Sequence, residues 1–367
     1  MKGDLVVKTV RTPHGIIVRI AAIAILLTVA LAGTFVSKGS ITFASSVIET
    51  PTQATPWGIA FDKSGHIWVA EPGCDPKPIC QSAFPSYIGE YTTSDFTLVQ
   101  NYLEPSGFSS PLFVAVDSTG HIWFTEPNSN AIGRLTPGST PNWEQWTIPT
   151  ANAIPYDLVV DKHGNIWFTE HGASQIGFFS TSTHTFVETP TPTAGSDPYG
   201  ITLAGSEKIW FAENTVPKIG SFTFTASGSI NIKEHTFSTV SNPAPTAHLI
   251  TSDHSGNIWY SEGFAGQIGE WIPSQGTYTN IVVSTASFTH ISGISVDSKN
   301  RIWFDDSLNA VVGYYDPSAG TIKTLTLSDL SDHPHDGLAV DSSDNTWFTE
   351  ELGGPTGRLA ELPAGNL

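Results

Sequence analysis

The chain has 367 residues, of which 39% are hydrophobic and 11% aromatic, while only 14% are charged. So few charges argue against a coiled coil or a bundle of long helices, and so much aromatic surface argues against a disordered chain. The formal net charge of −18 at pH 7 makes nucleic acid an unsuitable partner, because a phosphate backbone requires a basic face.

The first 45 residues have the composition of a targeting segment. Basic residues precede a 17-residue apolar run at positions 20–36, and small residues follow it. This order is typical of an export signal, and the run is also long enough for a short membrane anchor, so both remain open. The basic start favours an extracytoplasmic position, secreted or anchored, for residues 46–367.

The chain has two cysteines, Cys74 and Cys80, in a segment rich in Pro and Gly. In an oxidising compartment they can close a small disulfide loop. No nearby histidine supports a metal site in its place, so we predict the disulfide.

From residue 46 onward the chain repeats one unit seven times. Each unit has a short apolar strand, a polar turn that is usually Asp-x-x-Gly, and a second strand carrying Ile-Trp-Phe, as in FVAVDSTGHIWFTE, which ends at Glu126. The repeated tryptophans recur every 43 to 55 residues, the length of a four-stranded propeller blade. They are Trp68, Trp123, Trp167, Trp210, Trp259, Trp303 and Trp347.

The end of the last unit indicates how the ring closes. This unit stops at residue 362 and has no outer strand of its own, whereas residues 46–50 precede the first unit and can take that place. Such a closure hides the open edge of the ring. We predict an all-β fold, a monomeric seven-bladed β-propeller with four-stranded blades, closed by an N-terminal strand.

An acid stands three positions after each repeated tryptophan. Because it is present in every blade, we interpret it as a structural group that satisfies backbone donors in the following loop. The repeated tryptophans are interpreted as packing between blades. The acids are Glu71, Glu126, Glu170, Glu213, Glu262, Asp306 and Glu350.

The first strand of each unit opens with a Gly or its equivalent, and we expect the residue just before it to face the channel mouth. This residue differs between blades. One side of this ring is aromatic and apolar and the other is titratable, as a binding cleft requires. His290, His333 and His335 belong to the same loops, and a cluster of histidines favours function. The mouth residues are Trp57, Leu112, Tyr156, Tyr199, His248, Ser292 and Asp336.

The unit Asp-x-x-Gly-x-Ile-Trp-Phe-Thr-Glu, followed by Asn/Gln-x-Ile-Gly-Arg, resembles the repeat of the virginiamycin B lyase (streptogramin lyase) family. The likeness covers nearly everything after residue 46 and is clear at 117–134 and 161–177. It implies opening of cyclic depsipeptide antibiotics by elimination, and hence antibiotic resistance. A base removes a proton α to a carbonyl, and a magnesium ion steadies the enolate.

The resemblance implies a site made of one His, then Glu-x-His on the next blade, then a Glu after its Trp-Phe. His248 matches the first His. His290 stands where the Glu is expected, and Ser292 stands where the proton-abstracting His is expected. Asp306 replaces the final Glu and keeps an acid of shorter reach.

A second candidate lies one blade further, where His333-Pro-His335-Asp336-Gly337 is similar to Glu-Pro-His-Gly with one extra residue. His290 is also a candidate base, with Asp306, Asp336 or Glu350 holding a cation. We predict His248, His290 and His335 as catalytic. The predicted substrate-binding residues are Trp57, Leu112, Tyr156, Tyr199, Ser292 and Asp336, and the predicted magnesium ligands are Asp306 and Glu350.

Three functions remain as alternatives. The first is an extracytoplasmic lyase that opens a cyclic ester or depsipeptide, and the second is a non-catalytic propeller that binds a small molecule, cyclic peptide or protein. A calcium-dependent lactonase is third, because the mouth has one Asp and no Asn. Contact with a membrane is expected only through the N-terminal segment.

Overall fold

The computed structural model describes residues 47–73, 85–238, 245–328, 333–351 and 357–367. The predicted targeting segment and the Cys74–Cys80 pair lie outside these residues. Within them, no helix has the length and apolar character needed to cross a membrane.

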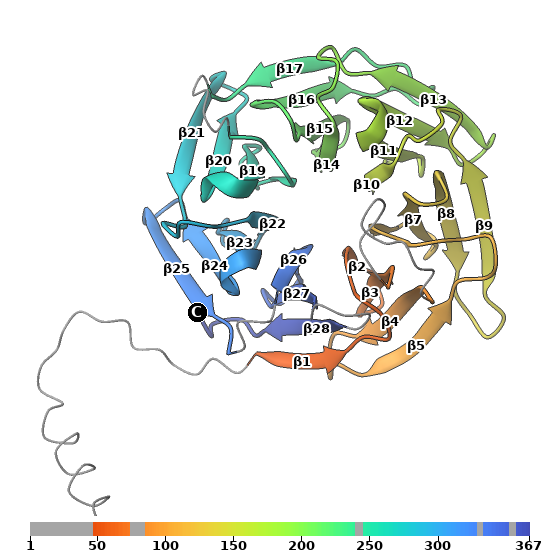
Figure 1. Cartoon of the computed structure of the whole chain (residues 1–367), viewed down its shortest axis with the longest axis horizontal. Helices are drawn as coiled ribbons and strands as arrows, with labels where there is room; N and C mark the ends of the chain where they lie inside the picture. Colours follow the sequence, from red (N-terminus) through yellow and green to blue (C-terminus); the bar gives the residue numbers. More distant parts are fainter. Residues whose placement is uncertain (1–46, 74–84, 239–244, 329–332, 352–356) are drawn as a thin grey trace, which may run out of the picture. The chain divides into compact units, whose positions relative to one another are not determined.

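Seven four-stranded antiparallel sheets stand in a ring (Figure 1), which confirms the predicted propeller. In the first blades the strands are β2 (Ile59–Phe61), β3 (His66–Glu71), β4 (Tyr87–Thr92) and β5 (Leu98–Leu103); β6 (Val114–Val116), β7 (Ile122–Glu126), β8 (Ala131–Thr136) and β9 (Asn142–Thr147); β10 (Pro155–Val160), β11 (Ile166–Glu170), β12 (Gln175–Ser180) and β13 (Thr185–Pro190); and β14 (Pro198–Ala204), β15 (Lys208–Glu213), β16 (Lys218–Thr223) and β17 (Lys233–Thr236).

The remaining blades are β18 (Ile250–Ser252), β19 (Ile258–Glu262), β20 (Gln267–Ile272) and β21 (Thr277–Val282); β22 (Ile291–Val296), β23 (Ile302–Asp306), β24 (Val311–Asp316) and β25 (Thr321–Thr326); and β26 (His333–Val340), β27 (Thr346–Glu351), β28 (Gly357–Leu362) and β1 (Ile48–Pro51). Three 3-10 turns complete the elements of the described residues: η1 (His171–Ala173), η2 (Gly263–Ala265) and η3 (Ser307–Asn309).

The ring closes through its first strand, as predicted. Strand β1 pairs antiparallel with β28, from Ile48 opposite Glu361 to Pro51 opposite Arg358. The last blade therefore takes its outer strand from the start of the propeller.

The repeated Asp and Trp form one unit of local structure. Asp161 Oδ1 accepts the backbone N–H groups of His163 and Asn165 at 2.8 and 3.0 Å, and its Oδ2 accepts Trp167 Nε1–H at 3.0 Å. The same Asp-to-Trp bond is present in six of the seven blades, and the fourth blade has no Asp in this turn. The turn and the second strand are thus fixed together.

The tryptophans pack between neighbouring blades, which confirms their structural interpretation. Trp167 contacts Phe222 of the next blade with ring centroids 5.1 Å apart, and Trp347 stacks on Phe96 of the first blade at 4.8 Å. The Ile-Gly pair of the third strand makes room for the other aromatic of the motif, because a Cβ at Gly133 would clash with the ring of Phe124.

The repeated acids are buried, and Glu71 and Glu126 among them accept hydrogen bonds from an unexpected segment. Glu71 Oε2 accepts the N–H groups of Gln53 and Ala54 at 2.8 and 2.9 Å, and Glu126 Oε1 accepts Ser109 N–H at 3.1 Å. These donors precede the first strand of the blade, not the loop after the acid as predicted. The reason is geometric: the second strand runs antiparallel to the first, so its end meets the segment that enters the first.

Candidate active site

The backbone of the mouth is held by side chains of neighbouring blades. The residue before the repeated acid donates its hydroxyl to the carbonyl of the next blade's mouth residue. These bonds join Thr125 to Tyr156 at 2.6 Å, Thr169 to Tyr199 at 2.6 Å, Ser261 to Ser292 at 2.7 Å and Thr349 to Trp57 at 3.0 Å. The positions of these four mouth residues therefore depend on two blades each.

An enlarged β-bulge places two functional side chains at the mouth from the last blade. In β10, Tyr156 and Asp157 stand opposite the single residue Thr169 of β11. In β26, by contrast, His335, Asp336 and Gly337 all stand opposite Thr349. The extra residue noted in the sequence is absorbed in this bulge, and bulges of this kind re-aim side chains. Both His335 and Asp336 consequently reach the site.

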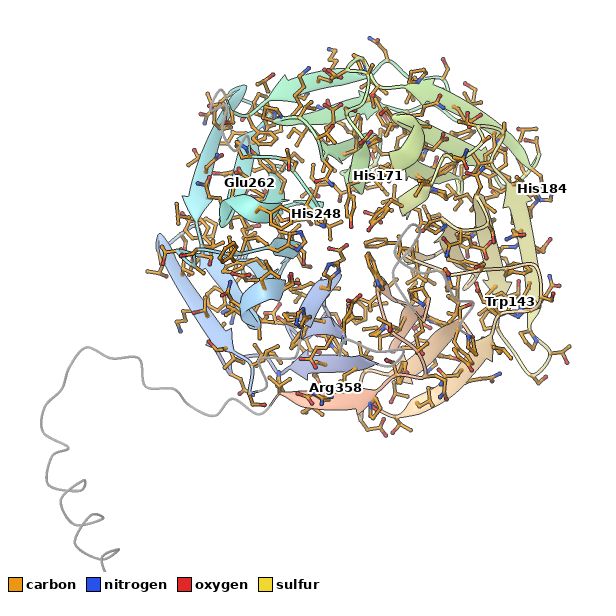
Figure 2. All side chains as sticks on the ribbon, in the orientation of Figure 1. Trp143, His171, His184, His248, Glu262 and Arg358 are labelled. Atoms are coloured by element: carbon orange, nitrogen blue, oxygen red, sulfur yellow. The ribbon has the colours of Figure 1, made fainter. Side chains whose placement is uncertain are left out.

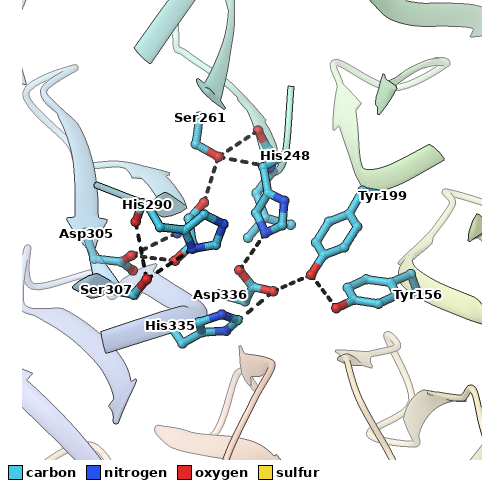
Figure 3. Close-up of polar contacts among 12 residues, drawn as sticks. Tyr156, Tyr199, His248, Ser261, His290, Asp305, Ser307, His335 and Asp336 are labelled. Carbon is cyan, nitrogen blue, oxygen red and sulfur yellow. Dashed lines mark hydrogen bonds and ion pairs between the residues drawn. The ribbon is translucent and has the colours of Figure 1, made fainter. Parts of the chain in front are cut away.

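Asp336 is the centre of the polar network at the mouth (Figure 3). Its Oδ1 lies 3.0 Å from His248 Nε2. Its Oδ2 accepts a hydrogen bond from the Tyr199 hydroxyl at 2.8 Å, and the same oxygen lies 3.7 Å from His335 Nδ1. Burial alone would raise the pKa of Asp336, but the charges of His335 and His248 outweigh it and hold that pKa well below its usual value. Asp336 is thus a buried carboxylate that orients two imidazoles.

The aromatic side of the mouth is continuous with this network. The ring of Tyr199 stacks on His248 with centroids 3.9 Å apart, and the hydroxyls of Tyr199 and Tyr156 share a hydrogen bond. Trp57 meets His335 edge-on at 4.9 Å and Tyr156 at 6.1 Å. An apolar wall therefore faces the titratable arc, as the sequence indicates.

His290 completes the imidazole cluster. Its ring lies 5.0 Å from His248 and 5.7 Å from His335, and its Nδ1 is 3.0 Å from Ser307 Oγ. Burial, followed by the charge of His248, lowers the pKa of His290 to about 4. This imidazole is therefore neutral at neutral pH, and it packs against the other two predicted catalytic histidines, His248 and His335.

Other predicted residues are placed differently. Ser292 is fully buried and donates its hydroxyl to Asp305 at 2.6 Å. Leu112 belongs to the buried cluster that contains Trp57. His333 begins β26 and is exposed.

The donor set around the predicted magnesium ligands does not suit a metal ion. Both oxygens of Asp306 are engaged, because they accept Thr289 Oγ1–H at 2.6 Å, His290 N–H at 3.1 Å and Asn309 Nδ2–H at 2.8 Å. Glu350 lies beside Arg358, with Oε2 and Nη1 3.7 Å apart. Among the described residues no three His, Cys, Asp or Glu side chains are arranged to hold a metal.

Sequence reasoning missed two titratable residues beside the site. His171 begins η1, and its ring lies 5.6 Å from Tyr156 and 5.7 Å from Tyr199. Asp305 is fully buried, and burial raises its pKa to about 6. Their signal is present in the repeat, since His171 directly follows a repeated acid and Asp305 replaces a residue that is Thr, Ser or Ala in the other blades.

The propeller has one cavity beside Asp336 and another at the opposite ends of the strands. One of about 200 Å³ lies in the channel against Asp336 and Asp157, with otherwise apolar walls from the first strands. A larger one of about 580 Å³ lies among the Asp-x-x-Gly turns of the first three blades, at the other ends of the strands. Figure 2 places His248 and His171 toward the middle of the ring and His184 at its outer side. The cluster of His248, His290 and His335 therefore lies at the mouth, away from the larger cavity.

Known proteins share both the sequence pattern and the fold. The model of the virginiamycin B lyase family matches residues 97–364, and no curated protein sequence matches the chain. A solved virginiamycin B lyase from Staphylococcus aureus is 24% identical, with a TM-score of 0.72 over 87% of this chain and 99% of that one. A catalytically inactive variant of that enzyme with quinupristin is 25% identical, with a TM-score of 0.71 over the same shares.

A solved streptogramin B lyase is also similar, with 24% identity and a TM-score of 0.72 over 86% of this chain and 97% of that one. The family match covers most of the chain and coincides with the repeats that build the ring. The protein therefore belongs to the virginiamycin B lyase family.

Proposed function

We propose that this protein is an extracytoplasmic lyase that opens a cyclic ester or depsipeptide by β-elimination at the channel mouth. The observation that carries the proposal is that His290 packs against both His248 and His335, and that these two imidazoles lie beside one buried carboxylate, Asp336. Turnover of a streptogramin antibiotic would confer resistance to it.

His290 is the group best prepared to accept the proton. Its Nδ1 can donate to Ser307 Oγ, whose own hydroxyl faces the His290 carbonyl at 3.4 Å, and this arrangement leaves Nε2 as the basic nitrogen. A positioned neutral imidazole is a general base. The proton lies on the carbon between a carbonyl group and the carbon that carries the ester oxygen.

His248 stabilises the negative charge that develops in this step. Asp336 fixes its ring through Nε2, and Tyr199 fixes it by stacking. When it carries a proton on both ring nitrogens, His248 donates Nε2–H to Asp336 and can donate Nδ1–H to the developing enolate oxygen, which lowers the barrier electrostatically. As His290 takes the proton, a carbon–carbon double bond forms, the carbon–oxygen bond breaks, and the carboxylate leaves with the electron pair.

Magnesium is part of the expectation from the family resemblance. Asp306 and Glu350 do not form a suitable donor set in this chain, so the steps above use side chains alone. A bound magnesium ion would supply further stabilisation of the enolate oxygen.

The test is ring opening of quinupristin by the wild-type chain and by His248→Ala, His290→Ala and His335→Ala, with His184→Ala as the outer-side control. Elimination gives a linear product with the mass of the substrate and a new double bond, whereas hydrolysis adds one water. We expect the first product, with loss of turnover in the His248 and His290 variants. Full activity in all three mouth variants would remove this site.

A second candidate is a propeller that binds the same ligand without turnover. It is supported by Ser292, whose hydroxyl is already engaged by Asp305 and is no base. In the same experiment this alternative gives bound quinupristin that remains cyclic.

A further inference from the structure

The larger of the two cavities, of about 580 Å³, lies at the ends of the strands away from the mouth. Sites for small molecules have volumes of about 300–1,000 Å³, so this cavity is large enough for one. The first three blades line it, each with the last residue of its first strand and the Asp-x-x-Gly turn that follows. The lining includes none of the mouth histidines His248, His290 and His335. We call this cavity the turn pocket.

The turn pocket opens where neighbouring turns are not bonded to each other. Elsewhere on this end of the ring, hydrogen bonds or ion pairs join the turns of neighbouring blades: Lys162 to Glu207, His254 to Asn300 and Ser298 to Asp344. Among the described residues no such bond joins the turns of the first, second and third blades. The space between these three turns is therefore left for a ligand.

The carboxylates in the lining are already saturated by donors of their own turns. Asp117 Oδ1 accepts the N–H groups of Thr119 and His121 at 2.8 and 3.1 Å and the Thr119 hydroxyl at 2.6 Å. Its Oδ2 accepts Trp123 Nε1–H at 2.9 Å and lies 3.0 Å from His121 Nδ1. The Asp residues of the other two turns hold their own turns and tryptophans in the same way. The polar groups left for a ligand are therefore mainly donors.

Positive charge is concentrated at the turn pocket, although the protein is acidic. Of the ten Lys and Arg residues in the described part of the chain, three line it: Lys63, Lys162 and Arg134. Arg134 is engaged by Glu144, whereas Lys63 and Lys162 are exposed. The ion pair of Lys162 with Glu207 leaves its ammonium group available, because pairs between exposed groups contribute little. The two lysines therefore favour an anionic ligand.

The other part of the lining is apolar. Phe61, Val116 and Val160 end the first strands of the three blades, and all three are half-buried. Covering their remaining exposed carbon surface with an apolar ligand is favourable. A small inorganic anion would leave this surface in water, and a neutral apolar molecule would leave the lysines without a partner. An apolar ring that carries one negative charge satisfies both parts of the lining.

We propose that the turn pocket binds a small aromatic carboxylate, with its ring against Phe61, Val116 and Val160 and its carboxylate between Lys63 and Lys162. Hydrogen bonds between an ammonium group and a carboxylate are among the strong ones, because both partners are charged. This binding site is separate from the proposed lyase site, since it lies at the other ends of the strands.

The test measures binding of 2-naphthoate to the full chain by calorimetry, with 2-naphthamide as the uncharged probe of the same shape and acetate as the anion without a ring. We expect 2-naphthoate to bind at least about 10-fold more tightly than either. Lys63→Ala and Lys162→Ala should each weaken its binding about 3- to 10-fold and leave that of 2-naphthamide unchanged. Lys299→Ala, in the turn of the sixth blade, is the matched control and should bind as wild type does.

A second pair of variants tests the location through repulsion. Ser118 is exposed and lines the turn pocket, so Ser118→Glu places a negative charge there and should weaken 2-naphthoate binding at least about 10-fold. Ser342 is also exposed and has the corresponding position in the last blade, so Ser342→Glu should have no effect. Melting curves confirm the fold of each variant.

The outcomes separate this proposal from the lyase proposal. Equal affinity for 2-naphthoate and 2-naphthamide, or unchanged binding in the Lys63, Lys162 and Ser118 variants, would overturn the turn pocket as an anion site. Loss of 2-naphthoate binding in His290→Ala would place the probe at the mouth and would also overturn it. Ring opening of quinupristin should be the same in Lys63→Ala as in wild type, so either proposal can fail while the other stands.

Discussion

His248 and Asp336 lie 88 positions apart in the chain, and His248 Nε2 is 3.0 Å from Asp336 Oδ1. They come from the fifth and the seventh blades and meet at the channel, with the sixth blade between them. Asp336 is also a member of the enlarged bulge in β26. One added residue therefore supplies the carboxylate that orients the mouth histidines.

Replacing this carboxylate is expected to impair turnover more than binding. In Asp336→Asn, His248 loses its anionic partner and its fixed tautomer, and we expect kcat to fall by about 10²- to 10⁴-fold. The measurement is kcat and KM for quinupristin together with the pH profile, since a purely structural residue would leave that profile unchanged. Asp344→Asn, at a turn that binds Ser298, is the control.

The lowered pKa of His290 predicts the acidic limit of activity. This imidazole is uncharged above a pKa of about 4 and becomes protonated, and inactive as a base, below it. The value of kcat/KM should therefore stay flat as pH falls from about 8 to about 5.5 and be halved near pH 4. A half-loss near pH 6.5 would assign the base to an unperturbed histidine.

The arrangement around Asp306 predicts that turnover withstands chelation. Because both of its oxygens accept hydrogen bonds, treatment with EDTA should change kcat/KM by less than about twofold. The matched experiment is titration with magnesium chloride. A large loss that magnesium restores would show that the loop rearranges to bind the ion.

A buried repeated acid should make stability depend on pH. Burial raises the pKa of Glu262 to about 7, and neither of its oxygens has a hydrogen-bond partner among the described residues. The unfolded chain loses this proton near pH 4.5 and the folded chain only near pH 7, so its contribution to stability is present below pH 4.5 and is lost as pH rises to 7.

Glu262→Gln removes that titration. We expect the free energy of unfolding of the variant, compared with wild type, to be about 1–3 kcal/mol more favourable at pH 8 than it is at pH 5. Urea unfolding at both pH values measures the difference. Glu71→Gln is the comparison, because Glu71 accepts two backbone N–H groups and the Tyr91 hydroxyl and its loss should destabilise at either pH.

The fold was predictable because the blades repeat the same local contacts within each unit. The Asp that closes the turn also binds the Trp of its own unit, and the Gly of the third strand accommodates the neighbouring ring. The free outer edge of the last unit and the short strand before the first likewise indicated the pairing of β1 with β28.

Side-chain direction at the mouth was less predictable, because it depends on contacts between blades. Ser292 turns to Asp305, and Asp306 turns to Thr289 in the segment before β22, although their sequence positions place both at the mouth end of the blade. The sequence placed both His335 and Asp336 at the mouth, but it did not predict the bulge in β26 that presents them together. Spacing fixes the blade and its end, while packing decides where a side chain points.

The pairing of β1 with β28 has a consequence for biogenesis. Residues 48–51 are synthesised before all the blades that follow them, yet their strand partner ends at Leu362. The circular arrangement therefore cannot be completed until β28 has been synthesised. A polypeptide truncated before Gly357 would leave the outer edge of β27 unprotected and, with it, a surface prone to aggregation.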